Sequence, residues 1–235
     1  MQRNLLKRSI RNFSTALLGA LLPFLQGCGT QQVTDVDGNK YQTVTIGNQV
    51  WMAENLKTTR LNDGTPIDQV TGYEQWAELD LPAYCWYNND STHRETYGAL
   101  YNWYVVETQK ICPEGWHVPS DEEWNEMVSL VADHSNIGGA LKESGTVHWR
   151  TPNAGATDEL GFSALPGGYR SYQGTFNLLR ASGYWWSSTE ANWYGASDTT
   201  PSRVIFRSVQ HDNPTLVRHI SEKTNGFSIR CVKNQ

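Results

Sequence analysis

The clearest folding signal of the chain lies in the stretch Cys112-Pro113-Glu114-Gly115-Trp116-His117-Val118-Pro119-Ser120-Asp121-Glu122-Glu123-Trp124. Ser120 and Glu123 have the spacing of a capping box, in which each side chain bonds the backbone amide of the other residue. Apolar residues then recur at helical spacing: Trp124, Met127, Val128 and Val131. This pattern predicts a helix that begins after Ser120 and packs its apolar face on the core.

A hairpin is predicted upstream of this helix. Residues 40–46 alternate in character, Gly47-Asn48 forms a turn signal, and residues 49–52 resume a β-rich pattern. Between the hairpin and the capped helix, residues 98–110 carry apolar side chains at helical spacing and predict another helix.

The second half of the chain is expected to be loop-rich with a late sheet. Residues 138–144 predict a short third helix, and residues 145–183 a long ordered loop region that buries Phe162, Leu165, Tyr169 and Tyr172. Strands are predicted at residues 184–188, 203–209 and 227–232. The order of hairpin, two main helices, long loops and late antiparallel sheet is typical of an α+β fold.

The N-terminus predicts export. Four basic residues precede an apolar run at residues 13–25 that is too short to span a bilayer. The run closes on Leu25-Gln26-Gly27-Cys28, which resembles a bacterial lipoprotein box, although Gln26 departs from the usual small residue. We therefore expect a signal peptide at residues 1–27, a lipidated Cys28 that opens a tether at residues 28–33, and one domain at residues 34–235.

The charge balance argues against nucleic acid as a partner. Removing residues 1–27 takes away four of the 19 Lys and Arg residues and none of the 24 Asp and Glu residues, which leaves a net charge of −9. Nucleic-acid binding requires clustered Lys and Arg. The lipid anchor instead makes the membrane an expected partner, and the cell envelope, with the outer membrane favoured, the expected location.

Several motifs identify a family resemblance. They are Val50–Leu56, Tyr84–Asp90, Tyr97–Trp103, Cys112–Trp124, Leu165–Arg170, Trp185–Thr189 and Gly226–Val232. In order and spacing these segments strongly resemble the Fibrobacter succinogenes major paralogous domain (FISUMP), over nearly all of residues 33–233. The resemblance implies an exported, often lipid-anchored domain and assigns no molecular activity.

A more distant likeness concerns the fold. The helix start at Pro119-Ser120 and the closing Gly226–Cys231 segment look like those of the formylglycine-generating enzyme and the wider C-type lectin-like fold. That likeness implies a disulfide between Cys112 and Cys231, with Cys85 left over. The pairing of Cys85 with Cys112 stays open as the alternative.

An enzyme is not expected. A formylglycine-generating activity would need paired reactive cysteines, and only Cys85 would be free. The six histidines are scattered and none lies near a nucleophile in a recognisable motif. Glu54, Glu123 and Glu143 are conceivable as paired carboxylates for glycoside hydrolysis, but nothing in the sequence defines their separation.

Saccharide binding is one chemistry that the aromatic residues would suit, because aromatic rings stack on sugar faces while polar side chains bond hydroxyl groups. The candidate ligand-binding residues are Trp186, Asn192, Trp193 and Tyr194. Neighbouring Trp185 and Trp186 should point to opposite faces of a strand, so that one of them is core. No metal site or cofactor is expected; Asp63 and the segment 88–90 could serve calcium but fit turns equally well.

The sequence thus predicts a non-catalytic cell-envelope lipoprotein that acts in binding or adhesion. The expected partner is a polysaccharide or a surface protein. A structural envelope protein that holds a protein partner is the nearest alternative, and an enzyme of the formylglycine-generating type is the third.

Overall fold

The computed structural model describes residues 31–191 and 203–235, and within them it shows an α+β fold. The strands are β1 (Gln32–Thr34), β2 (Lys40–Ile46), β3 (Gln49–Met52), β4 (Asp68–Gln69), β5 (Ala83–Cys85), β6 (Leu100–Tyr101), β7 (Trp116–His117), β8 (Tyr169–Arg170), β9 (Phe176–Asn177), β10 (Ser182–Ala191), β11 (Arg203–Gln210), β12 (Asn213–Glu222) and β13 (Val232–Lys233). The helices are α1 (Tyr73–Ala77), α2 (Arg94–Tyr97), α3 (Trp103–Glu107), α4 (Asp121–Ser129) and α5 (Ile137–Leu141), with short 3-10 turns at Tyr87–Asn89, Ser91–His93 and His134–Asn136.

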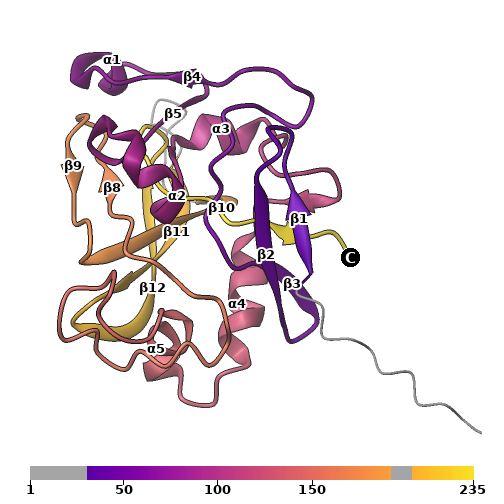
Figure 1. The fold of residues 1–235 in the computed structure, drawn as a ribbon, viewed down its shortest axis with the longest axis vertical. Helices are drawn as coiled ribbons and strands as arrows, with labels where there is room; N and C mark the ends of the chain where they lie inside the picture. Colours follow the sequence, from indigo (N-terminus) through magenta and orange to yellow (C-terminus); the bar gives the residue numbers. More distant parts are fainter. Residues whose placement is uncertain (1–30, 192–202) are drawn as a thin grey trace, which may run out of the picture.

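Two larger sheets organise the fold (Figure 1). One has the strand order β1-β2-β3-β13-β7, so the last strand of the chain lies between the early hairpin and β7. The other is the antiparallel sheet β10-β11-β12, and the small sheets β4-β5-β6 and β8-β9 complete the structure. The predicted β2–β3 hairpin and the late antiparallel sheet are therefore confirmed.

The capped helix is confirmed in its local chemistry. The Ser120 hydroxyl accepts a hydrogen bond from the Glu123 amide, and the Glu123 carboxylate accepts one from the Ser120 amide. Trp124 and Met127 are completely buried on its apolar face. The short third helix is also present, as α5.

Three predicted elements differ from the structure. The helix expected at residues 98–110 is confined to α3, because Leu100 and Tyr101 pair with β5 as strand β6. Strand β12 was not predicted. In the expected strand at residues 227–232 only Val232 is in a regular strand, since Phe227 and Ser228 make single bridges to Tyr101 and Trp185.

A disulfide joins Cys112 to Cys231, with Cα atoms 6.0 Å apart. This bond confirms the pairing that the fold likeness implies and excludes the alternative with Cys85. It ties the segment before α4 to the segment that leads into β13. Cys85 is a free cysteine, and its side chain is fully buried.

Buried cations organise the loops. Arg170, Lys142 and Arg230 are each at most 1% exposed, although charged side chains are rarely buried without a charged partner. Lys142 Nζ donates to the carbonyls of Ala154, Gln210 and Asn213 at 2.8–3.2 Å. Such a buried ammonium satisfies carbonyl groups that the loops leave outside regular structure.

Arg170 likewise satisfies backbone carbonyls, in a different set of loops. Its guanidinium donates to the carbonyls of Val70, Thr71, Gly72 and Gly174 at 2.6–3.0 Å. It also lies 4.3 Å from the ring centroid of Trp76, within the range of a cation–π contact. Arg170 thereby joins the loop before α1 to the turn between β8 and β9.

Among the described residues, no helix has the length and apolar character needed to cross a bilayer.

Candidate functional site

Two surface hollows bring together residues with recognition chemistry. The first, here called the polar cleft, has a volume of about 290 Å³. It is lined by Ala53, Glu54, Asn55, Lys57, Glu95, Thr96, Glu143, His148, Ser163 and Leu165. These residues come from the segment after β3, from α2, and from the loops that follow α5.

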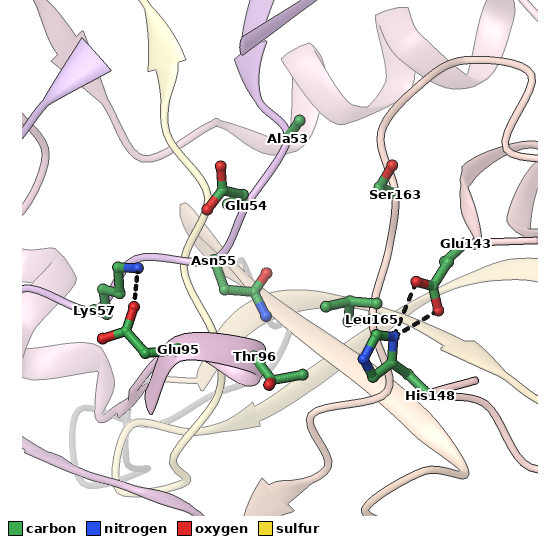
Figure 2. A pocket seen from close by; sticks show the side chains of 10 residues that line it. All are labelled: Ala53, Glu54, Asn55, Lys57, Glu95, Thr96, Glu143, His148, Ser163 and Leu165. Carbon is green, nitrogen blue, oxygen red and sulfur yellow. Dashed lines mark hydrogen bonds and ion pairs between the residues drawn. The ribbon is translucent and has the colours of Figure 1, made fainter. Parts of the chain in front are cut away.

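Ion pairs lie on both sides of the polar cleft (Figure 2). Lys57 Nζ is 2.6 Å from Glu95 Oε2, and this contact lowers the pKa of Glu95. On the opposite side in this view, both carboxylate oxygens of Glu143 lie 2.9 Å from His148 Nδ1. Between the pairs, Glu54 accepts a hydrogen bond from the Gln42 amide.

The floor of the cleft is held by a buried network around Asn55. Its Oδ1 accepts hydrogen bonds from Trp185 Nε1 and Arg230 Nε, both at 2.9 Å, and its Nδ2 donates to the Tyr97 carbonyl and the Ser228 hydroxyl. Arg230 also donates to the carbonyls of Phe162 and Ser163. The motifs that carry the family resemblance converge here, so their polar residues build the floor from inside.

The structure brings together two of the three carboxylates considered for hydrolysis. Glu54 and Glu143 line the same cleft, whereas Glu123 lies elsewhere, engaged in the capping box and bonded to His117 Nε2 at 2.8 Å. The hydrogen bond that the Glu123 carboxylate accepts from His117 raises the pKa of His117 above 6.5. Because of these contacts, Glu123 has a structural role.

The second hollow, here called the tyrosine cup, has a volume of about 260 Å³. It is lined by Tyr169, Ser171, Tyr172, Tyr184, Phe206, Ile220, Ser221, Glu222, Asn225 and Phe227. Phe206 and Phe227 are buried and form its base, while Tyr169 and Tyr184 are half-buried. Tyr172 is 48% exposed.

Ring packing makes the base of the cup rigid. The rings of Tyr184 and Phe227 stack with centroids 5.3 Å apart, and the centroids of Tyr169 and Tyr184 are 4.8 Å apart. Burial raises the pKa of Tyr184, so its hydroxyl is protonated at neutral pH. The cup therefore combines packed aromatic surface with the neutral hydroxyl group of Tyr184.

The exposed tyrosine is positioned by its turn. Tyr172 lies between β8 and β9, and its amide donates to Asn225 Oδ1 at 2.8 Å. Asn225 Nδ2 in turn donates to the Ser221 hydroxyl. Gly174 has φ +86°, and a Cβ there would lie 2.6 Å from the Tyr73 carbonyl oxygen, so this turn requires glycine.

The expected ligand-binding residues have mixed outcomes. Trp186 is a correction: it is completely buried, and its Nε1 donates to the Tyr101 carbonyl at 2.7 Å, so its ring is not available to a ligand. Trp185 is buried as well, because β10 lies between two core clusters and each tryptophan enters one of them. Cys28, Asn192, Trp193 and Tyr194 lie outside the described residues.

The cup residues were missed by sequence reasoning. Tyr172 was expected to be buried and is exposed instead, because it lies in the turn that joins two short strands. The turn signal Ser171-Tyr172-Gln173-Gly174 could have indicated this exposure. No local pattern in the sequence indicates that Tyr172 lies near Glu222, which is 50 positions further along the chain.

The possible calcium ligands serve turns. Asp63 accepts from the Thr65 amide and pairs with Lys110, and Asp90 accepts from the Thr92 amide. Within residues 31–191 and 203–235, no group of three or more His, Cys, Asp and Glu residues is arranged to hold a metal ion.

The buried thiol of Cys85 leads to a labelling prediction. Desolvation raises the pKa of Cys85 to about 12, and the thiolate is the reactive form. Iodoacetamide at pH 7.5 should therefore leave Cys85 unmodified in the folded protein and alkylate it in guanidinium chloride, as measured by peptide mass spectrometry. Rapid labelling of Cys85 in the folded protein would contradict this environment.

These features define an α+β domain whose surface hollows include the polar cleft and the tyrosine cup. A model of the Fibrobacter succinogenes major domain family matches residues 44–233. The chain belongs to this family. Comparisons with curated proteins and with solved structures gave no match.

Proposed function

We propose that this protein is a lipid-anchored, non-catalytic binding module of the cell envelope that holds a saccharide in the tyrosine cup. The observation that carries the proposal is the cup itself, in which Tyr169, Tyr172 and Tyr184 line one open hollow beside the carboxylate of Glu222. Aromatic surface with a few fixed polar groups is the usual make-up of a ligand site. Rings of this kind pack against the apolar faces of sugars, and the polar groups bond their hydroxyls.

The envelope location is part of the same proposal. It is supported by the lipoprotein-like segment Leu25-Gln26-Gly27-Cys28 after a basic, apolar start. Acylation of Cys28 would hold the domain at a bilayer, with the outer membrane as the favoured one. Mass spectrometry of the native N-terminus tests this part: an acylated Cys28 supports it, and an intact Met1 or unmodified Cys28 rejects it.

We also propose that the fold is C-type lectin-like. In support, the Cys112–Cys231 disulfide joins the segment before α4 to the segment that leads into the last strand, and long loops connect α5 to the late sheet. An oxidised disulfide of this kind suits an exported protein.

A non-catalytic role is supported by the state of Cys85. Its thiol is fully buried, and the high pKa keeps it protonated, so it lacks the properties of a nucleophile. The paired-cysteine chemistry of the formylglycine-generating type has no second free thiol among the described residues.

Replacing Tyr172 by alanine should weaken saccharide binding about tenfold or more, equivalent to about 1.4 kcal/mol. The reason is that Tyr172 is the most exposed ring of the cup, and aromatic contacts contribute strongly to recognition. The test is calorimetry of the full-length chain in detergent with hexasaccharides of β-1,4-glucan, β-1,3-glucan and β-1,4-mannan.

Leu81→Ala is the control, since Leu81 is a large exposed side chain (65%) that does not line the cup. It should bind the panel as the unmodified protein does. Equal losses in the two variants, or no binding to any member, would reject the cup as the site. If no saccharide of the panel bound and crosslinking recovered a protein partner, the alternative of a structural envelope protein would be favoured.

A further inference from the structure

We infer that the tyrosine cup selects uncharged saccharides and rejects acidic ones, with Glu222 as the residue that makes the selection. This inference rests on the proposed function and adds the chemical class of the ligand. The first observation is the charge of the lining: among the described residues that form the cup, Glu222 is the sole charged side chain. The site thus has a negative charge and lacks a cation of its own.

The hydrogen-bond roles of the other polar residues make Glu222 the main acceptor. Asn225 uses its amide oxygen for the Tyr172 backbone and its amide nitrogen for Ser221. The Ser171 hydroxyl bonds the Thr175 hydroxyl. These groups are engaged in holding the cup together, so they have little capacity left for a ligand.

Glu222 is placed to meet a ligand. It is the last residue of β12, and its side chain is 42% exposed. Its Oε1 lies 3.2 Å from the guanidinium of Arg203, the residue opposite it on β11. Arg203 lies outside the lining and contacts Oε1, which leaves Oε2 as the carboxylate oxygen that is open to a ligand.

The selection follows from what a carboxylate can do. An ionised carboxylate accepts hydrogen bonds and donates none, so it suits the hydroxyl groups of a neutral sugar. A uronic acid would bring a second carboxylate to a partly desolvated hollow. The two like charges would repel each other, and juxtaposed like charges strongly disfavour binding.

The tyrosine side chains of the cup supply no positive charge to offset this repulsion. Burial raises the pKa of Tyr184, which keeps its ring neutral. Arg170, the buried cation next to Tyr169 on β8, directs its donors at four backbone carbonyls and does not line the cup. An acidic sugar would therefore meet Glu222 in a lining that holds no cation, and the Arg203 guanidinium outside the lining is already engaged with Glu222.

The test compares each neutral hexasaccharide of the panel with its C6-oxidised, uronic acid form. The full-length protein should bind the neutral form about tenfold tighter or more, a difference that corresponds to about 1.4 kcal/mol. In Glu222→Gln, the ratio should fall to one or below, because the repulsion is removed, the side chain keeps its size, and Arg203 loses its carboxylate partner. Raising the salt concentration should narrow the ratio in the unmodified protein.

Glu78→Gln is the control, since Glu78 is exposed and does not line the cup; it should keep the ratio of the unmodified protein. Equal binding of neutral and oxidised forms, or a ratio unaffected by Glu222→Gln, would overturn the selection and leave the proposed function standing. Binding of neither form by any member of the panel would reject both.

Discussion

Arg170→Met should lower the free energy of unfolding by about 3 kcal/mol or more. The substitution removes the donors that serve four backbone carbonyls, and each buried acceptor left unsatisfied costs about 1–3 kcal/mol. Methionine fills much of the same volume, so the loss reports mainly on the hydrogen bonds. Urea unfolding followed by tryptophan fluorescence measures the effect.

Arg60→Met provides the comparison. Arg60 has a side chain 57% exposed and makes a single ion pair with Asp37 at 3.5 Å, so its replacement should cost less than about 1 kcal/mol. If the two variants unfolded at the same urea concentration, the buried guanidinium would not be the organiser of these loops.

The Arg170→Met substitution should also affect the tyrosine cup. Arg170 donates from Nε to the carbonyl of Gly174, in the turn that presents Tyr172, and its backbone exchanges hydrogen bonds with Gly226. Loss of the guanidinium frees the turn, and the ring then has to be ordered when a ligand binds. Stability and binding are therefore linked through one residue that never touches the ligand.

Removing the disulfide by Cys112→Ala together with Cys231→Ala should cost about 2–5 kcal/mol of stability. The bond joins residues 119 positions apart, and a cross-link over so long a loop strongly restricts the unfolded chain. Both cysteines are buried, so the effect includes a small loss of packing. Thermal and urea unfolding of the oxidised protein and the double variant give the difference.

Reductant separates the cross-link from the packing. Dithiothreitol should lower the unfolding midpoint of the unmodified protein toward that of the double variant and leave the double variant unchanged. A midpoint that is insensitive to reductant in both proteins would show that the bond contributes nothing to stability.

The parts of the fold that the sequence predicted well are those set by neighbouring residues. The capping box at Ser120 and Glu123 depends on two side chains three positions apart, and the β2–β3 hairpin depends on the Gly47-Asn48 turn. In both cases the partners are close in the chain, so the pattern alone contains the information.

The errors arose where distant partners override the local pattern. Leu100 and Tyr101 have helical spacing with the residues that follow, yet they pair with β5 because that position completes a small sheet. Trp185 and Trp186 were expected on opposite faces, which is correct, but the sheet is covered on both faces and both rings are core. The alternation of side chains along a strand predicts the face of the sheet to which each side chain points. It does not predict whether that face is covered by other parts of the protein.

The candidate site was beyond the reach of sequence for the same reason. The cup joins the turn after β8 to the end of β12, and its polar groups are orientated by Asn225 and Arg170 through bonds between distant segments. The sequence predicted aromatic rings beside polar side chains, and the tyrosine cup combines these two kinds of residue at positions that were not predicted.

The central claim is that the tyrosine cup is where this domain holds its ligand. Two-dimensional NMR of the full-length chain in detergent, titrated with the neutral hexasaccharide panel, tests it most directly. We expect saturable shifts in the amide signals of Tyr172 and Asn225, with the signals of Glu54 and His148 in the polar cleft unmoved. Shifts confined to the polar cleft, or none with any saccharide, would contradict the claim.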